Sequence, residues 1–343
     1  MDLDRLVRPN ILNLKPYSSA RDEFKGTASV YLDANESPYN SPFNRYPDPL
    51  QTAVKEKIAE IKNVETQQIF LGNGSDEPID LLFRVFCEPT VDNVVSIYPT
   101  YGMYEVAAGI NNVEYRKFLL DEKFSFSAGE LIESAVDDRT KMIFLCSPNN
   151  PTGNNLNKGE MQSAVELFEG IVVVDEAYID FSLQTSMLED LAVYENLVVL
   201  QTFSKAWGNA AIRLGMAFAN PKIVSLLNKV KYPYNINVLT HDHALKMLEN
   251  EDGISKWVMT TLRERELMIY KLSQLKCVKK IYHSDANFLL VKVSDANALY
   301  NHLVENGVIV RNRNKVTLCD DCLRITVGTT AENEYLLGAL KTF

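Results

Sequence analysis

The sequence predicts an α/β protein in which a mostly parallel sheet forms a large domain and a smaller α+β domain follows it. Between about residues 68 and 219, short β-rich runs alternate with helical stretches, and most of the runs are apolar throughout. Continuous apolar strands of this kind belong to sheets that helices cover on both faces. The 343 residues also exceed the length at which a single core stops growing, so we expect two domains.

Seven β-rich runs are the expected strands of the large sheet. In an open α/β sheet, ligands bind beyond the carboxyl ends of the strands. Asn150, Asp175 and Lys205 each lie at or shortly after the end of such a run, so we expect them at one edge of the sheet. The seven runs span residues 68–71, 94–97, 113–118, 142–146, 171–175, 197–201 and 214–219.

After Pro221 the pattern changes to that of a smaller α+β domain. Two helical stretches follow, and apolar residues from Ile254 to Leu275 in the second recur at about helical spacing, which predicts core packing. Strands are then expected at 288–293, 308–311 and 323–327, and helices at about 295–306 and 331–342. We therefore divide the chain into an N-terminal arm near the small domain (1–26), a large domain (27–236) and a small domain (237–343).

The composition limits the classes of partner and the compartment. The net charge is −10 and no basic stretch offsets it, which argues against nucleic acid as a partner. No apolar run approaches the ~20 residues of a membrane span, and the first residues lack the basic start and apolar core of a signal peptide. The five cysteines show no paired-spacing framework, so we expect a reducing cytoplasm.

A CxxC at Cys319 and Cys322 raises the question of zinc. Structural zinc needs four ligands, and no second CxxC or suitably spaced histidine pair follows this one. His241 and His243 lie far away in the sequence. We therefore expect these residues to be structural and expect no metal site.

Lys205 is the strongest candidate for chemistry. It follows the expected strand 197–201, with Thr202 and Ser204 just before it and Arg213 eight residues later. An amine in this position can form a Schiff base with an aldehyde cofactor. The two hydroxyls and the guanidinium can bind a phosphate group of that cofactor.

A second phosphate-binding segment is expected at residues 72–78, Gly-Asn-Gly-Ser-Asp-Glu-Pro, which leads from a strand into a helix. Pro78 suits the first turn of that helix. Free backbone N–H groups at a helix N-terminus, with the helix dipole behind them, bind anions. Ser75 and Asp76 would contribute mainly such backbone donors.

Two further segments carry a resemblance to a known family. Ser-Pro-Asn-Asn-Pro-Thr-Gly at 147–153 follows one strand, and Asp175 ends another with Tyr178 three residues later. The order Asn150, Asp175, Tyr178, Lys205, Arg213 resembles the pyridoxal phosphate (PLP)-dependent aminotransferases of fold type I. This likeness implies the fold of that family and PLP as the cofactor, with Lys205 as the residue that holds it and moves the proton.

The resemblance also implies a role for the other residues around PLP. Asp175 would pair with the nitrogen of the PLP ring, while Asn150 and Tyr178 would bond its phenolic oxygen. Tyr101, in Tyr-Pro-Thr-Tyr-Gly at 98–102, matches the aromatic residue that stacks on the ring. Tyr46, in Arg-Tyr-Pro-Asp-Pro at 45–49, resembles the tyrosine that reaches the neighbouring subunit's phosphate, which implies a homodimer.

Segments near both ends of the chain narrow the resemblance to the histidinol-phosphate aminotransferase group. It implies that Tyr17, Asn35 and Arg311 contact the phosphate end of the substrate, and that Arg324 pairs with the α-carboxylate of glutamate. The implied reaction is reversible amino transfer between L-glutamate/2-oxoglutarate and imidazole-acetol phosphate/L-histidinol phosphate, in histidine biosynthesis. The segments are 10–21, 32–38, 286–288, 308–313 and 323–329.

Other functions remain open on the same motifs. An aromatic amino-acid aminotransferase, or a PLP decarboxylase acting on a phosphorylated amino acid, would share the cofactor residues. A sensor domain of a transcription regulator is a third alternative, but only about 30 residues precede the expected core and they are not rich in lysine and arginine.

Overall fold

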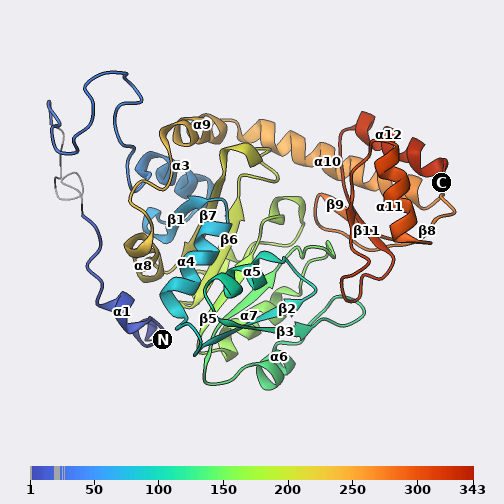
Figure 1. Ribbon diagram of the computed structural model, residues 1–343, viewed down its shortest axis with the longest axis horizontal. Coiled ribbons are helices and arrows are strands. Elements are labelled where there is room, and N and C mark those ends of the chain that lie inside the picture. The colour runs from blue at the N-terminus through green and yellow to red at the C-terminus, as the bar shows by residue number, and fades with distance from the viewer. Residues whose placement is uncertain (1, 19–23, 25, 27) are drawn as a thin grey trace.

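The computed structural model describes residues 2–18, 24, 26 and 28–343 (Figure 1). A seven-stranded sheet forms the large domain, with strand order β1-β7-β6-β5-β4-β2-β3. Only β7 is antiparallel to its neighbours, β1 and β6, and the other pairs are parallel. The prediction of a mostly parallel sheet is confirmed. The strands are β1 (Ile69–Asn73), β2 (Asn93–Tyr98), β3 (Glu114–Leu119), β4 (Thr140–Cys146), β5 (Ile171–Asp175), β6 (Leu197–Thr202) and β7 (Leu214–Ala219).

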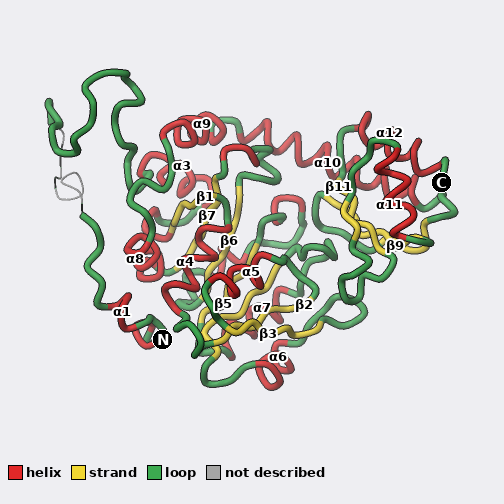
Figure 2. The backbone as a smooth tube through the Cα atoms, viewed as in Figure 1, coloured by secondary structure: helices red, strands yellow, loops and turns green. Residues whose placement is uncertain are grey.

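Helices cover both faces of this sheet, as the continuous apolar strands predicted (Figure 2). Alternate residues of β5 point to opposite faces, because side chains alternate along a strand. Val172 and Val174 belong to one buried cluster, and Ile171 and Val173 belong to the other. The first cluster is covered by α3 (Thr52–Lys62), α6 (Ala128–Ala135) and α7 (Lys158–Leu167), and the second by α4 (Asp76–Phe86), α5 (Met103–Ile110) and α8 (Pro221–Val230).

The small domain has its own antiparallel sheet, of order β10-β11-β9-β8, and a separate core. Its first strand was not predicted, because two exposed lysines interrupt the apolar pattern there. The strand expected at 308–311 is shorter, since the Val308 N–H bonds to the Leu303 carbonyl at the end of α11. The elements are β8 (Val278–Ile281), β9 (Phe288–Val293), α11 (Ala296–Glu305), β10 (Arg311–Asn312), β11 (Cys322–Thr326) and α12 (Thr330–Lys341).

The two domains are joined by one long helix, α10 (Glu251–Leu272), which follows α9 (Val238–Leu248). Ile254, near its start, belongs to a core cluster of the large domain, whereas Met268 and Leu272 belong to the small-domain core. Trp257 is 48% exposed, so this part of the predicted apolar stripe is not core. Because α9 packs on α3 of the large domain, we propose a domain boundary within α10, later than the predicted residue 236.

The N-terminal arm differs from its prediction. Its described residues lie against the large domain, where Leu3 and Val7 are buried with α4 and α8. The Arg8 N–H donates to the Val85 carbonyl at 3.0 Å, and the Arg8 side chain pairs with Glu88. The burial of Leu3 and Val7 against the large domain is the physical reason that the arm is not near the small domain. Residues 1, 19–23 and 25 of the predicted arm lie outside the described residues.

The remaining helices are short. None of the helices in the described part of the chain is long and apolar enough to cross a membrane. The short ones are η1 (Leu3–Arg5), α1 (Pro9–Leu12), η2 (Thr66–Gln68), η3 (Ile179–Phe181), η4 (Met187–Asp190) and η5 (Ala210–Ile212).

Candidate active site

A pocket of about 220 Å³ lies at the carboxyl-end edge of the large sheet. Ten of the residues predicted to bind the cofactor line it, although they come from five different segments of the chain. This gathering follows from the topology, since parallel strands end at the same edge. The ten are Ser75, Asp76, Tyr101, Asn150, Asp175, Tyr178, Thr202, Ser204, Lys205 and Arg213.

Lys205 is held in a turn directly after β6. The Thr202 hydroxyl accepts a hydrogen bond from the Ser204 N–H at 3.1 Å, which fixes the start of this turn. The Lys205 amine lies 5.5 Å from the centre of the Tyr178 ring. Burial lowers the pKa of Lys205, and the positive charges of Arg324 and Arg213 lower it further, against the opposing effect of Asp175. The environment therefore favours the neutral, nucleophilic form of this amine.

Asp175 is a buried carboxylate at the end of β5. It accepts hydrogen bonds from the Tyr104 hydroxyl at 2.7 Å and from the Ala177 N–H at 3.1 Å. Burial raises the pKa of Asp175, and these two bonds oppose that rise. Within the described residues it forms no ion pair, so a protonated ring nitrogen in the pocket would supply its missing counter-charge.

Tyr104 is a partner of Asp175 that the sequence did not predict. It is wholly buried on α5 and packs edge-on against Tyr101, with ring centres 5.5 Å apart. The only signal in the sequence is its place three residues after Tyr101, which is one helical turn. That spacing does not reveal that the Tyr104 hydroxyl points at Asp175.

The residues predicted to bind phosphate, here called the phosphate cradle, lie where the β1–α4 loop meets the residues before β7. Ser75 is the N-cap of α4 and makes no side-chain capping bond, which leaves the first amides available to an anion. The Gly74 N–H bonds to the Arg213 carbonyl at 2.9 Å. The Arg213 guanidinium donates to the Ala210 carbonyl and lies 4.0 Å from Asp76.

Close backbone packing in this cradle requires two glycines. Gly74 has a φ of +67°, and a Cβ there would lie 2.6 Å from Arg213 Nη2. A Cβ on Gly215 would lie 2.3 Å from the Gly74 carbonyl carbon. The left-handed φ favours glycine at position 74, and the nearby backbone leaves no space for a side chain at position 215.

Asn150 connects the pocket to the small domain. Its side-chain NH₂ donates to the Tyr178 hydroxyl at 3.5 Å, and its side-chain oxygen accepts a hydrogen bond from Arg324 of β11. Phe288 of β9 contacts both Tyr178 and Arg324. Its ring centre lies 5.1 Å from that of Tyr178 and 5.3 Å from Arg324 Cζ. Burial raises the pKa of Tyr178, so its hydroxyl is neutral at ordinary pH.

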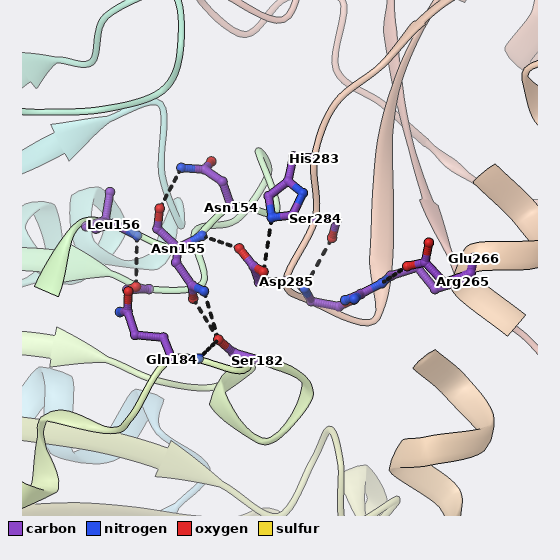
Figure 3. Close-up of polar contacts among 12 residues, drawn as sticks. Asn154, Asn155, Leu156, Ser182, Gln184, Arg265, Glu266, His283, Ser284 and Asp285 are labelled. Atoms are coloured by element: carbon purple, nitrogen blue, oxygen red, sulfur yellow. Dashed lines mark hydrogen bonds and ion pairs between the residues drawn. The ribbon is translucent and has the colours of Figure 1, made fainter. Parts of the chain in front are cut away.

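A turn of the small domain fixes the loop that carries Asn150 (Figure 3). Asp285 accepts a hydrogen bond from the Asn155 N–H at 2.9 Å, and its own N–H donates to the Gly153 carbonyl at 2.7 Å. His283 lies 3.1 Å from the same carboxylate. Asn149 was not predicted as a site residue from the sequence. Its side-chain NH₂ donates to the Pro99 carbonyl at 2.9 Å, which ties the same loop to the segment after β2.

The predicted substrate arginines face the same side of the small sheet. Arg311 and Arg324 are directly paired residues of the antiparallel strands β10 and β11, and such pairs project to one face. Arg311 is exposed, whereas burial lowers the pKa of Arg324 and the charge of Arg311 lowers it further. Two guanidinium groups side by side are suited to an anionic substrate.

Five of the predicted site residues do not line the pocket. Arg311 and Arg324 are two of them, although Arg324 bonds to Asn150, which does line it. Tyr17, Asn35 and Tyr46 are the other three, and all three are exposed. Tyr46 stacks on Tyr234 with ring centres 4.4 Å apart. The described residues 28–51, which lead into α3, form a loop at the upper left of Figure 1.

Comparison with known proteins identifies the family. The profile of "Aminotransferase class I and II" matches residues 12–340. The chain is 59% identical over 342 residues to a histidinol-phosphate aminotransferase of Bacteroides thetaiotaomicron, covering 99% of both chains. The chain belongs to the class I and II aminotransferase family.

Solved structures agree on the fold. A histidinol-phosphate aminotransferase from Clostridium acetobutylicum superposes with a TM-score of 0.80 at 24% identity, covering 88% of this chain and 90% of that one. One from Sinorhizobium meliloti, solved in complex with pyridoxal-5'-phosphate, gives a TM-score of 0.81 at 20% identity, covering 90% and 89%. The prediction of this PLP-dependent transferase fold is confirmed.

The pocket of this aminotransferase suits PLP on its own chemistry. Asp175 forms no ion pair in the part of the chain that the structure describes, Lys205 has a lowered pKa, and the uncapped N-terminus of α4 lies beside Arg213. These three features match the ring nitrogen, the aldehyde and the phosphate of PLP. In the described part of the chain, no group of three or more His, Cys, Asp or Glu residues could hold a metal ion. Cys319 and Cys322 are buried and unbridged.

Proposed function

We propose that this aminotransferase uses PLP to transfer an amino group between L-glutamate/2-oxoglutarate and imidazole-acetol phosphate/L-histidinol phosphate, as a step of histidine biosynthesis. The observation that carries the proposal is the pair Arg311 and Arg324. Both project from the same face of the small sheet, and Arg324 bonds to Asn150, which lines the pocket of Lys205. The name of the Bacteroides thetaiotaomicron relative, which is 59% identical, supports the same substrate.

The residues of the pocket have separate tasks in this reaction. PLP, when bound, supplies an aldehyde that takes up the amino group and a ring that draws electrons from the substrate carbon. Lys205 Nζ moves the proton at that carbon, and its lowered pKa leaves it able to accept one. Asp175 holds the ring nitrogen, and Asn150 and Tyr178 hold the phenolic oxygen.

The two arginines fit two substrates of different length. In glutamate a carboxylate is attached directly to the carbon that carries the amine, and the Arg324 fork suits it. In histidinol phosphate a CH₂–O link separates that carbon from the phosphorus, so the anion lies further out. We assign the phosphate to Arg311, together with Tyr17 and Asn35.

The active unit in this proposal is a homodimer. Tyr17, Asn35 and Tyr46 are exposed, and Leu32 and Tyr39 in the same segment are 89% and 79% exposed. A run of exposed apolar side chains of this kind is typical of a surface that a partner covers. A second copy would bring Tyr46 to the neighbouring phosphate cradle. We place the enzyme in the cytoplasm, because its five cysteines are unbridged, as in a reducing compartment.

The function is tested with three amine donors. The PLP-loaded enzyme is mixed separately with L-glutamate, L-histidinol phosphate and L-phenylalanine, and the loss of cofactor absorbance is followed in a single turnover. We expect fast reaction with glutamate, with release of 2-oxoglutarate, and fast reaction with histidinol phosphate, but slow reaction with phenylalanine. A preference for phenylalanine would instead assign an aromatic aminotransferase, and release of CO₂ from a phosphorylated amino acid would assign a decarboxylase.

A further inference from the structure

A third arginine, Arg313, lies beside the pair that the proposed function uses. Its backbone N–H donates to the Cys322 carbonyl at 2.9 Å, which continues the β10–β11 ladder one residue beyond β10. Because side chains alternate along an extended strand, Arg313 projects to the same side as Arg311, two residues before it. The sheet therefore presents three guanidinium groups on one side.

Within the described residues, no hydrogen bond or ion pair is formed by the Arg313 side chain. Its Nε is buried and makes no hydrogen bond, and within the described residues none of Arg311, Arg313 and Arg324 forms an ion pair with a carboxylate. Burial lowers the pKa of Arg313 to about 10, and the charges of Arg324 and Arg311 contribute to the decrease. A half-buried guanidinium beside two like charges is costly unless an anion neutralises it.

Arg324 connects the three arginines to the pocket. Its guanidinium donates to the side-chain oxygen of Asn150, which lines the pocket and donates in turn to the Tyr178 hydroxyl. The positive charges of Arg324 and Arg313 also oppose the rise of the Tyr178 pKa. Tyr178 lines the pocket next to Lys205. An anion that bridges Arg311 and Arg324 would therefore come within reach of Arg313.

We propose that Arg313 binds the phosphate of the substrate and makes the site prefer a phosphate to a carboxylate. This inference rests on the proposed function. A carboxylate has one negative charge and two oxygens, which a single arginine fork satisfies. A phosphate monoester carries about −1.5 to −2 charges at pH 7 and three acceptor oxygens, so it can use further guanidinium groups.

The test compares Arg313→Gln and Arg313→Lys with the wild type, all loaded with PLP. Lys315→Gln is the matched control, because Lys315 is exposed in the same loop and its loss changes the net charge equally. Inorganic phosphate and acetate serve as probes, and their binding is measured by calorimetry. The kcat and KM of the histidinol-phosphate and glutamate half-reactions are measured in parallel.

We expect Arg313→Gln to weaken phosphate binding, and to lower kcat/KM for histidinol phosphate, by about 10- to 100-fold, as for a lost charged hydrogen bond. The loss should appear mainly in KM. Acetate binding and the glutamate half-reaction should change by less than about threefold, Arg313→Lys should recover part of the loss, and Lys315→Gln should behave as wild type.

Three results would overturn the assignment: equal losses for phosphate and acetate, an unchanged Arg313→Gln variant, or no phosphate binding to the wild type. A changed cofactor absorbance in Arg313→Gln, with equal losses on both substrates, would indicate that Arg313 only supports Tyr178. If the wild type binds phosphate through Arg313 but does not convert histidinol phosphate, the proposed function fails while the anion site remains.

Discussion

Arg324 of the small domain donates a hydrogen bond to the side-chain oxygen of Asn150, which lies on a loop of the large domain. The NH₂ group of Asn150 donates in turn to the Tyr178 hydroxyl. The residue proposed to bind the substrate carboxylate is therefore connected, through one amide, to a residue proposed to hold the cofactor. Arrival of a carboxylate at Arg324 would compete with Asn150 for the guanidinium.

Substitution of Arg324 by lysine tests the role of its fork. The charge is kept, but the two parallel hydrogen bonds to a carboxylate are lost. We expect kcat/KM for glutamate to decrease by about 10- to 100-fold, the range of a charged hydrogen bond. Steady-state kinetics with glutamate measure the effect. Arg263→Lys, on the exposed face of α10, is the control, and an equal loss in that variant would contradict the assignment.

The lowered pKa of Lys205 predicts how cofactor loading depends on pH. Only the neutral amine reacts with an aldehyde, so the loading rate of the PLP-free protein should rise with pH and level off below the ordinary 10.5 of lysine. Arg324→Gln removes a positive charge that lowers this pKa, so the midpoint of the rise should move to higher pH. Stopped-flow absorbance measures the rate, and Lys205→Ala should show no covalent loading and no amino transfer. A midpoint that stays in place in Arg324→Gln would refute the electrostatic coupling.

Loss of the Tyr104 hydroxyl should weaken cofactor binding. In Tyr104→Phe, a buried oxygen of Asp175 loses its 2.7 Å hydrogen bond, which otherwise opposes the raised pKa. Asp175 is then protonated more easily and attracts a protonated ring nitrogen less strongly. We expect about 1 kcal/mol of weaker PLP binding, or roughly fivefold, by equilibrium dialysis. Tyr335→Phe removes a hydroxyl that bonds to Asn306 in the small domain and should leave PLP affinity unchanged.

Gly215→Ala should displace the backbone of the phosphate cradle at Gly74. The added Cβ would lie 2.3 Å from the Gly74 carbonyl carbon, so the β1–α4 loop or β7 must move. We expect about 1–3 kcal/mol of lost stability together with weaker PLP binding. Gly338→Ala in α12 is the control, since a Cβ there meets nothing within 4 Å and alanine favours a helix. Thermal unfolding with and without PLP separates the two effects, and an unchanged Gly215→Ala protein would contradict the prediction.

The residues of the pocket could be predicted because each follows a strand that the sequence marks clearly. Asp175 ends a run of β-branched residues, and Lys205 follows another, so local patterns placed both at one edge of the sheet. Their chemical roles remain predictions, since the structure gives their positions only. The sequence did not reveal Tyr104, because which carboxylate a buried hydroxyl meets is decided by the packing of α5 on the sheet.

Other features depend on contacts between distant parts of the chain. The arm was expected near the small domain, but Leu3 and Val7 are buried with apolar residues of α4 and α8, a contact that no local pattern encodes. β8 is an edge strand with exposed Lys279 and Lys280, so its sequence lacks the apolar pattern that predicts a buried strand. Tyr46 is predicted to act on a neighbouring subunit, which one chain by itself cannot place, and Tyr17 and Asn35 are exposed in the same part of the chain.

The unbroken course of α10 has a mechanical consequence. Its 22 residues extend about 33 Å at 1.5 Å per residue. Near its start, Trp257 lies over Gly208, in the turn that carries Lys205, and its far end is built into the core of the small domain. A tilt of about 5° at the first turn would displace the far end by about 3 Å over that length. Asn250 precedes the first turn of α10 and is remote from every reacting atom. Substitutions around it are therefore expected to tilt α10, move Arg311 and Arg324 with the small domain, and change the affinity for substrate.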